Sequence, residues 1–181
     1  MGIIRWACII SLLLFLISCK KERGNKVGDS DFQPIDRGTV EVKDLYLVFQ
    51  ENGSNIKDTF KYKTSQLADT IYLRKNSTYN AQVYFLDQSG KEVSSVIREK
   101  GEDYIVCYSP SKPTSLKLDQ VSKDINGDDL GVSTKWTAAE LTNTNERNTL
   151  NVTLNYQALP KDNFCSPGVR LIDANFIYKI K

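Results

Sequence analysis

Apolar and polar residues alternate along much of the chain beyond residue 38, with a period of two residues. The segments 79–85 and 150–156 show this alternation most clearly, because every second residue in each is apolar. A period of two places successive side chains on opposite faces of a β-strand. Both segments are therefore predicted to be strands with one buried face and one exposed face.

Short runs rich in β-branched and aromatic residues predict further strands, since such side chains fit a pleated surface. These runs are 45–49, 60–62, 70–73, 104–108, 116–121, 132–136 and 174–180. Residue pairs typical of turns separate them, among them Asn52-Gly53, Lys75-Asn76, Ser89-Gly90 and Asn126-Gly127. Apolar residues at helical spacing predict a short helix within 92–100, and a second helical turn is predicted near Thr137.

This order of elements indicates an all-β fold rather than alternating strands and helices. We expect an antiparallel β-sandwich of about seven to nine strands, with one or two short helical turns between them.

The start of the chain has a different pattern. Arg5 precedes an apolar run that ends in Leu16-Ile17-Ser18-Cys19. A positive start, an apolar segment of roughly 7–15 residues and small residues before the cleavage point are typical of a secretory signal. The run of about eleven residues is too short to cross a bilayer, which needs roughly 20 residues of helix. Residues 1–18 are therefore predicted to be a signal peptide that is removed.

The Leu-Ile-Ser-Cys ending resembles the lipobox of bacterial lipoproteins. The resemblance implies that Cys19 becomes the first residue and carries a diacylglycerol thioether and an acylated amine, with acyl chains such as palmitate. Several acyl chains hold a protein to a membrane far more firmly than one. Two alternatives stay open: an ordinary signal peptide that ends near a cysteine, or an apolar segment that is not processed.

Polar and small residues dominate 19–37, which is predicted to be a lipidated, flexible tether. Residues 38–181 are then of a length typical of one domain, a single β-sandwich. We expect a lipid anchor in the outer membrane. An acidic cluster often follows the cysteine in surface-exported lipoproteins of the Bacteroidota, but Lys20, Lys21, Glu22 and Arg23 follow Cys19 here. The periplasmic face and the cell surface both stay open.

Charge and composition exclude several classes of function. The formal net charge is +2, and removal of the signal peptide with Arg5 leaves +1. A nearly neutral domain has no basic footprint for nucleic acid. The sequence has no histidine, so His-based catalytic pairs and His-ligated metals are excluded. No Gly-rich phosphate loop is present either, and we expect a protein that is not an enzyme.

Two cysteines, Cys107 and Cys165, belong to the predicted domain. In an oxidising compartment they could form a disulfide, and the bond would close a loop of about 58 residues and stabilise the fold by roughly 4 kcal/mol. The alternative is a buried, reduced Cys107 in the apolar run 104–108 and an unpaired Cys165. The sequence leaves both interpretations open.

One acidic cluster invites a metal-binding interpretation. It contains Asp124, Asn126, Asp128 and Asp129, whose carboxylate and amide oxygens suit Ca²⁺. The spacing does not follow an EF-hand loop, which needs Gly at position six and Glu at position twelve. Asn-Gly between two strands is also the preferred centre of a β-hairpin turn, and this is the favoured interpretation.

The aromatic residues of the predicted strands allow two interpretations as well. Tyr84 falls on the face opposite Phe85, together with Asn80 and Gln82. An outward aromatic ring beside amides could stack against a sugar or a peptide. A cross-strand pair on a solvent-exposed face is the favoured alternative.

Several segments together resemble a group of Bacteroidota lipoproteins of uncharacterised function. The matching segments are 68–73, 76–79, 83–87, 124–127, 130–131, 134–137 and 149–156. The resemblance implies an immunoglobulin-like β-sandwich at the cell envelope, in some members associated with TonB-dependent outer-membrane receptors. It implies no functional residues.

The leading hypothesis is therefore a lipid-anchored binding protein of the cell envelope, accessory to TonB-dependent uptake through the outer membrane. A second hypothesis is a structural or adhesin-like module without a small-molecule ligand. The third is a calcium-stabilised binding domain centred on the acidic cluster. The ligand, the partner and the oligomeric state are not predicted.

Overall fold

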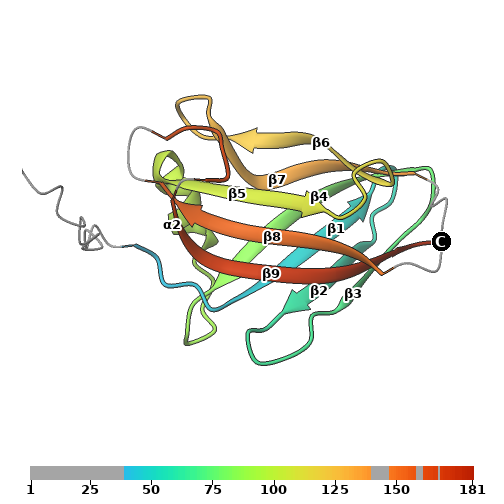
Figure 1. The fold of residues 1–181 in the computed structure, drawn as a ribbon, viewed down its shortest axis with the longest axis horizontal. Helices are drawn as coiled ribbons and strands as arrows, with labels where there is room; N and C mark the ends of the chain where they lie inside the picture. Colours follow the sequence, from blue (N-terminus) through green and yellow to red (C-terminus); the bar gives the residue numbers. More distant parts are fainter. Residues whose placement is uncertain (1–38, 140–146, 158–160, 167) are drawn as a thin grey trace, which may run out of the picture. The chain divides into compact units, whose positions relative to one another are not determined.

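Nine strands in two sheets make up most of the part of the chain that the computed structural model describes, residues 39–139, 147–157, 161–166 and 168–181 (Figure 1). The strands are β1 (Asp44–Glu51), β2 (Lys57–Tyr62), β3 (Thr70–Leu73), β4 (Ser77–Leu86), β5 (Tyr104–Pro110), β6 (Leu116–Lys123), β7 (Asp129–Ala138), β8 (Asn148–Tyr156) and β9 (Val169–Ile180). Between β4 and β5 lie the helix α2 (Ser94–Glu99) and the 3-10 turn η1 (Gly101–Asp103). The prediction of an all-β fold is confirmed, and each predicted strand lies within an observed one.

The first sheet has the strand order β2-β1-β4-β7-β6 and is antiparallel throughout. The second has the order β3-β9-β8-β5, in which β3 runs parallel to β9. The prediction of a purely antiparallel fold is wrong at this pair. Parallel neighbours need a long connection, and most of the domain lies between β3 and β9, so no hairpin dictates their direction.

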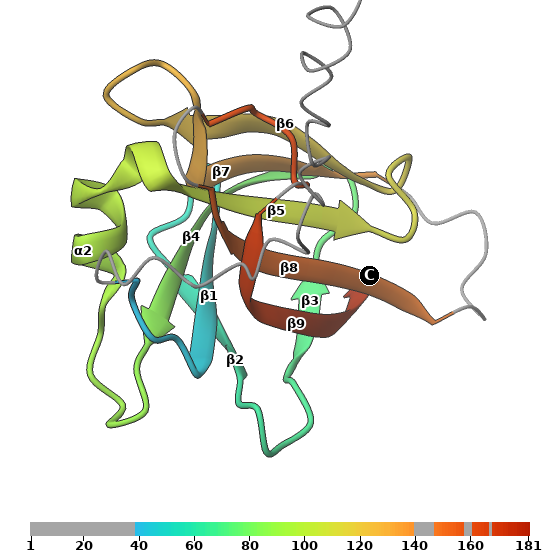
Figure 2. The same cartoon turned by 60° about the vertical axis from the view of Figure 1, so that its left-hand side comes forward.

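A single hydrophobic core takes side chains from both sheets, which lie face to face (Figure 2). Alternating apolar and polar residues along the strands give rise to this core. Tyr79 and Phe85, at the two ends of the predicted strand 79–85, are buried, whereas Asn80 is exposed. Trp136 of β7 is fully buried, and its Nε1 donates a hydrogen bond to Thr134 Oγ1 over 2.7 Å. Its ring and that of Tyr108 from the second sheet form a T-shaped pair, with centroids 5.5 Å apart.

Gly131 in β7 marks a close approach of the two sheets. Its φ is +79°, and a Cβ atom at this position would lie 2.5 Å from the carbonyl oxygen of Val106 in β5. The Gly131 carbonyl accepts a hydrogen bond from the Tyr108 hydroxyl over 2.8 Å. Only glycine satisfies both the backbone angle and the contact.

The two helix predictions have different outcomes. The helix predicted within 92–100 is α2, whose Ser94 and Ile97 are buried. The turn predicted near Thr137 is wrong for Thr137 and Ala138, because β7 continues through both and Thr137 pairs with Thr78 of β4. Cross-strand pairing overrides the weak local helix preference here. Ala139 is not helical either, and its N–H donates to the carbonyl of Ser115 over 2.8 Å. Glu140 and Leu141 of that predicted turn lie outside the described residues.

The predicted signal peptide, Cys19 and the tether of 19–37 also lie outside the described residues. Within the ranges given above, no helix is both long and apolar enough to cross a membrane.

Candidate functional site

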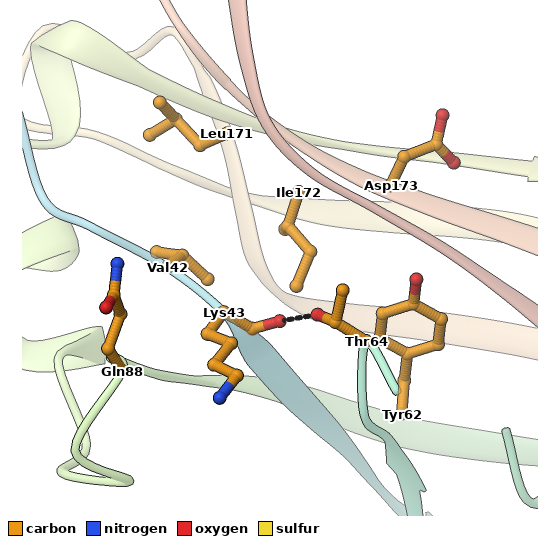
Figure 3. A pocket seen from close by; sticks show the side chains of 8 residues that line it. All are labelled: Val42, Lys43, Tyr62, Thr64, Gln88, Leu171, Ile172 and Asp173. Atoms are coloured by element: carbon orange, nitrogen blue, oxygen red, sulfur yellow. Dashed lines mark hydrogen bonds between the residues drawn. The ribbon is translucent and has the colours of Figure 1, made fainter. Parts of the chain in front are cut away.

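An open hollow of about 550 Å³ lies between the beginning of β1 and the end of β2 in the first sheet and the beginning of β9 in the second (Figure 3). Eight residues line it: Val42, Lys43, Tyr62, Thr64, Gln88, Leu171, Ile172 and Asp173. We refer to this set as the hollow. Sequence reasoning missed it, because its members come from four separate segments whose proximity depends on how the sheets pack.

Two hydrogen bonds of Thr64 fix the wall on the side of the first sheet. The Thr64 hydroxyl donates to the backbone carbonyl of Lys43, and the Thr64 backbone N–H donates to Asp44 Oδ1 over 3.0 Å. In Figure 3 the Ile172 side chain points toward the bond between Lys43 and Thr64, whereas the Asp173 carboxylate points away from it. The hollow thus has an apolar wall next to a fixed polar one.

The two charged residues of the hollow differ in how they are paired. The Asp173 carboxylate accepts hydrogen bonds from Arg170 Nη1 over 2.7 Å and from Asn151 Nδ2 over 2.5 Å. The exposed Lys43 makes no ion pair with any described residue. The hollow therefore offers one unpaired positive charge to a ligand.

The acidic cluster forms the turn between β6 and β7. The Asp124 carboxylate accepts hydrogen bonds from the backbone N–H groups of Asn126 and Asp128, both over 2.9 Å. The Asp124 N–H donates to the Asp128 carbonyl over 2.8 Å, so three residues, 125–127, form the loop and not the two-residue Asn-Gly turn; Gly127 ends it with a φ of +88°. The hairpin interpretation of the sequence is confirmed by the antiparallel pairing of β6 with β7.

Asp124 also forms a buried ion pair with Lys161, which the sequence did not reveal. Lys161 Nζ lies 2.8 Å from Asp124 Oδ2 and 3.0 Å from the carbonyl oxygen of Gly101, and both charged side chains are only 1% exposed. Burial acts to raise the pKa of Asp124. The hydrogen bond and charge of Lys161, together with the backbone donors of Asp128 and Asn126, outweigh burial and hold this pKa below its ordinary value.

Asp128 and Asp129 of the cluster are also engaged by the protein itself. Asn163 Nδ2 donates to Asp128 Oδ1 over 2.9 Å, and the Asp129 backbone N–H donates to Asn163 Oδ1 over 2.5 Å. The Asp129 carboxylate pairs with Lys123. In the described part of the chain, no group of three or more His, Cys, Asp or Glu side chains is arranged to hold a metal ion. A calcium site here remains a prediction from sequence, and it competes with these bonds.

The structure joins Cys107 of β5 to Cys165 by a disulfide, with the two Cα atoms 5.8 Å apart. Residues 161–166, here called the clasp, are thus held at three points: Lys161 on Asp124, Asn163 on the turn after β6, and Cys165 on β5. Figures 1 and 2 show this segment beside the turn between β6 and β7. Local pattern gave no signal for Lys161 or Asn163, since their partners lie about 35 residues away or more.

Tyr84, the candidate stacking residue, pairs with Tyr46 of the neighbouring strand. The two rings are nearly parallel, 10° apart in plane, with centroids 4.7 Å apart. The Arg98 guanidinium lies 5.7 Å from the centroid of Tyr84, and the Tyr84 hydroxyl donates to Gln82 Oε1 over 2.6 Å. The rings stack on each other, so the geometry is that of the cross-strand pair rather than a free platform.

No protein-family model matches this chain, and no curated protein matches it either.

Proposed function

We propose that the chain is a lipid-anchored binding protein of the cell envelope, accessory to a TonB-dependent receptor of the outer membrane. One observation carries the proposal: the apolar run that ends in Leu16-Ile17-Ser18-Cys19 precedes a polar tether and a β-domain. A lipid on Cys19 would hold the domain at the membrane. Its work would then be to bind a partner or a ligand there.

The disulfide between Cys107 and Cys165 supports an exported protein. Structural disulfides persist in the periplasm and outside the cell and are rare in the cytosol. The hollow supports a binding role, because it combines apolar walls with a few polar groups, as ligand sites do. Val42 and Lys43 belong both to the hollow and to the beginning of the domain, a short distance along the chain from the tether.

We further propose that the domain is an immunoglobulin-like sandwich. The strand order supports this assignment when β1, β4, β5, β6, β7, β8 and β9 are taken as strands A to G. The first sheet then contains the order A-B-E-D and the second the order C-F-G, as in constant-type immunoglobulin domains. β2 and β3 are additions at the edges of the two sheets.

Metabolic labelling with radioactive palmitate in the native host tests the lipid anchor. The full chain should incorporate label and sediment with membranes, whereas Cys19→Ala should lose the label and leave the membrane fraction. Cys8→Ala, which removes a cysteine from the predicted signal peptide, is the matched control and should keep both properties. Label that is retained in Cys19→Ala would refute the anchor.

Cross-linking of the native lipoprotein in its own membrane, followed by purification and mass spectrometry, tests the partner. Recovery of a TonB-dependent receptor in near-equal amount is the expected result. Recovery of no envelope protein would contradict the accessory role and favour an adhesin-like or structural module.

A further inference from the structure

We propose that the exposed backbone of β9 at Asp173 and Asn175, together with the hollow beside it, binds an extended segment of a partner polypeptide as an added β-strand. The inference rests on the proposed function, because it takes the partner to be a protein of the cell envelope. It names the mode of recognition, which is main-chain hydrogen bonding at a sheet edge.

The two neighbours of β9 cover it unequally. β8 pairs with β9 from Val169 to Tyr178. β3 pairs with β9 only from Ile177 to Ile180. The β3 side of β9 is therefore without a partner strand over the first two thirds of its length, among the residues that the structure describes.

The hydrogen bonds at the end of β9 show which backbone groups face this side. The Lys181 N–H donates to the carbonyl of Leu73, and the Lys181 carbonyl accepts from the N–H of Lys75, both over 2.9 Å. Backbone groups of alternate residues point to the same side of a strand. The N–H and C=O groups of Asn175 and Asp173 therefore point to the β3 side, where β3 is absent. We call these groups the open edge.

The next positions support the same assignment. Asn151 Nδ2 of β8 lies 3.5 Å from the Ala174 carbonyl oxygen. The backbone carbonyl of Ala174, which lies between Asp173 and Asn175, therefore faces β8. Toward the beginning of β9 the register shifts, because Ile172 lies opposite Leu154 and Arg170 opposite Asn155. The extra residue, Leu171, is a β-bulge that interrupts the regular ladder, which resumes at Arg170 and Val169. The open edge is thus a short regular stretch with defined limits.

The hollow provides space for an added strand next to these groups. Ile172 and Asp173 belong to the hollow and also flank or form the open edge. Tyr62 of β2 and Val42, which precedes β1, stand on the opposite side of the hollow (Figure 3). An added strand would continue the line of β3, and one of its side chains would contact the apolar wall.

Charge indicates the chemistry of the occupant. Lys43 is unpaired among the described residues, whereas the Asp173 carboxylate is held by Arg170 and Asn151. Of the two charged residues that line the hollow, only Lys43 has no ion pair with a described residue, so its ammonium group favours a segment with a carboxylate side chain. The occupant is therefore an extended segment in which an apolar residue stands next to an acidic one.

Photo-crosslinking of the full mature lipoprotein in its own membrane tests the proposal. Benzoylphenylalanine replaces Gln88, an exposed residue of the hollow, or Gln120, an exposed residue on the edge strand β6 as the control. We expect adducts from position 88 only. Mass spectrometry should map them to one extended, acidic segment of one envelope protein.

Two variants then separate backbone from side-chain recognition. Asp173→Pro removes the outward N–H of the open edge and leaves the ladder to β8, since proline is tolerated where the N–H faces away from the sheet. Asp173→Ala removes the carboxylate and keeps the N–H. A synthetic peptide of the cross-linked segment should bind the Asp173→Pro variant at least about tenfold more weakly than the Asp173→Ala variant, because both lack the carboxylate and only the first lacks the N–H.

Lys43→Glu provides a test that does not depend on proline being accommodated. It should weaken binding of the same peptide about tenfold, and raised salt should weaken binding to the original protein as well. Equal binding by Asp173→Pro and by Asp173→Ala would overturn the proposal. So would the absence of adducts at position 88, adducts only to a second copy of this chain, or adducts only to its own residues 20–37. None of these outcomes changes the palmitate result, so this inference can fail while the lipid anchor stands.

Discussion

The clasp and the open edge follow each other closely in the sequence, yet they differ in how their polar groups are bonded. In the clasp, Lys161 and Asn163 satisfy a buried carboxylate and the backbone of a neighbouring hairpin. At the open edge, the outward groups of Asp173 and Asn175 have no backbone partner in the described part of the chain. A polar group must be bonded by the chain, by water or by a partner.

The difference indicates that the clasp stabilises the fold and that the open edge is available to bind another strand. Buried polar groups that are fully paired fix a connection in place. Unpaired edge groups are a template for another strand, and proteins usually protect them. The disulfide and the ion pair therefore hold the beginning of β9 in position. The open edge, which follows in β9, is fixed relative to the rest of the domain.

The largest expected effect comes from Lys161→Met. The variant leaves the Asp124 carboxylate buried without its cation, and breaking a buried pair in this way costs about 3 to 5 kcal/mol in the free energy of unfolding. Urea denaturation of the mature protein measures the change. Adding Asp124→Asn should recover a large part of the loss, because the uncompensated charge is then gone. A decrease of less than about 1 kcal/mol in the free energy of unfolding would show that the pair contributes no more than an ordinary surface ion pair.

Removal of the disulfide should have the next largest effect. Replacing both Cys107 and Cys165 by alanine should lower the free energy of unfolding by about 2 to 4 kcal/mol, because the unfolded chain is no longer constrained. Denaturation with and without a reducing agent gives the measurement. The reducing agent should destabilise the original protein and have no effect on the double variant, and an effect on both would contradict the assignment.

The pH dependence of stability should show the contribution of Asp124. Its pKa in the folded protein lies below the ordinary 3.8. The stability that it contributes is therefore fully present above that ordinary value and is lost as pH falls through the lowered pKa of the folded state. Thermal unfolding of the original protein and of Asp124→Asn at pH values from 6 to 2 compares the two. The curves should converge at the acidic end, and parallel curves would contradict the shift.

The smallest effect is expected at the open edge. Asp173→Ala removes an exposed ion pair with Arg170 and a hydrogen bond from Asn151, so it should change the free energy of unfolding by less than about 1 kcal/mol. Denaturation under the conditions used for Lys161→Met makes the comparison. A loss as large as that of the clasp variant would show that Asp173 has a structural role.

The sequence predicted the strands because alternation and turn pairs are local signals. Asn80 and Gln82 on one face of β4, and the Asn126-Gly127 turn, illustrate how far such signals reach. The parallel direction of β3 and the extension of β7 through Thr137 were not predicted, since each depends on a strand distant in sequence.

The candidate site was less predictable for the same reason. The two cysteines were identified, but only the fold brings Cys165 to Cys107. Lys161 looks like any surface lysine in the sequence and acquires its role from Asp124. The open edge has no side-chain signature at all, because it consists of backbone groups and depends on where β3 ends.

Hydrogen exchange of single amide protons in the mature protein, followed by NMR, tests the contrast between the two regions most directly. The Asp173 and Asn175 amides should exchange at least about a hundredfold faster than those of Ala174 and Phe176, which face β8, and faster than the bonded Asp128 and Asp129 amides of the turn that the clasp holds. Equal protection of Asp173, Asn175 and Ala174 would show that the chain already covers this edge and would contradict the account.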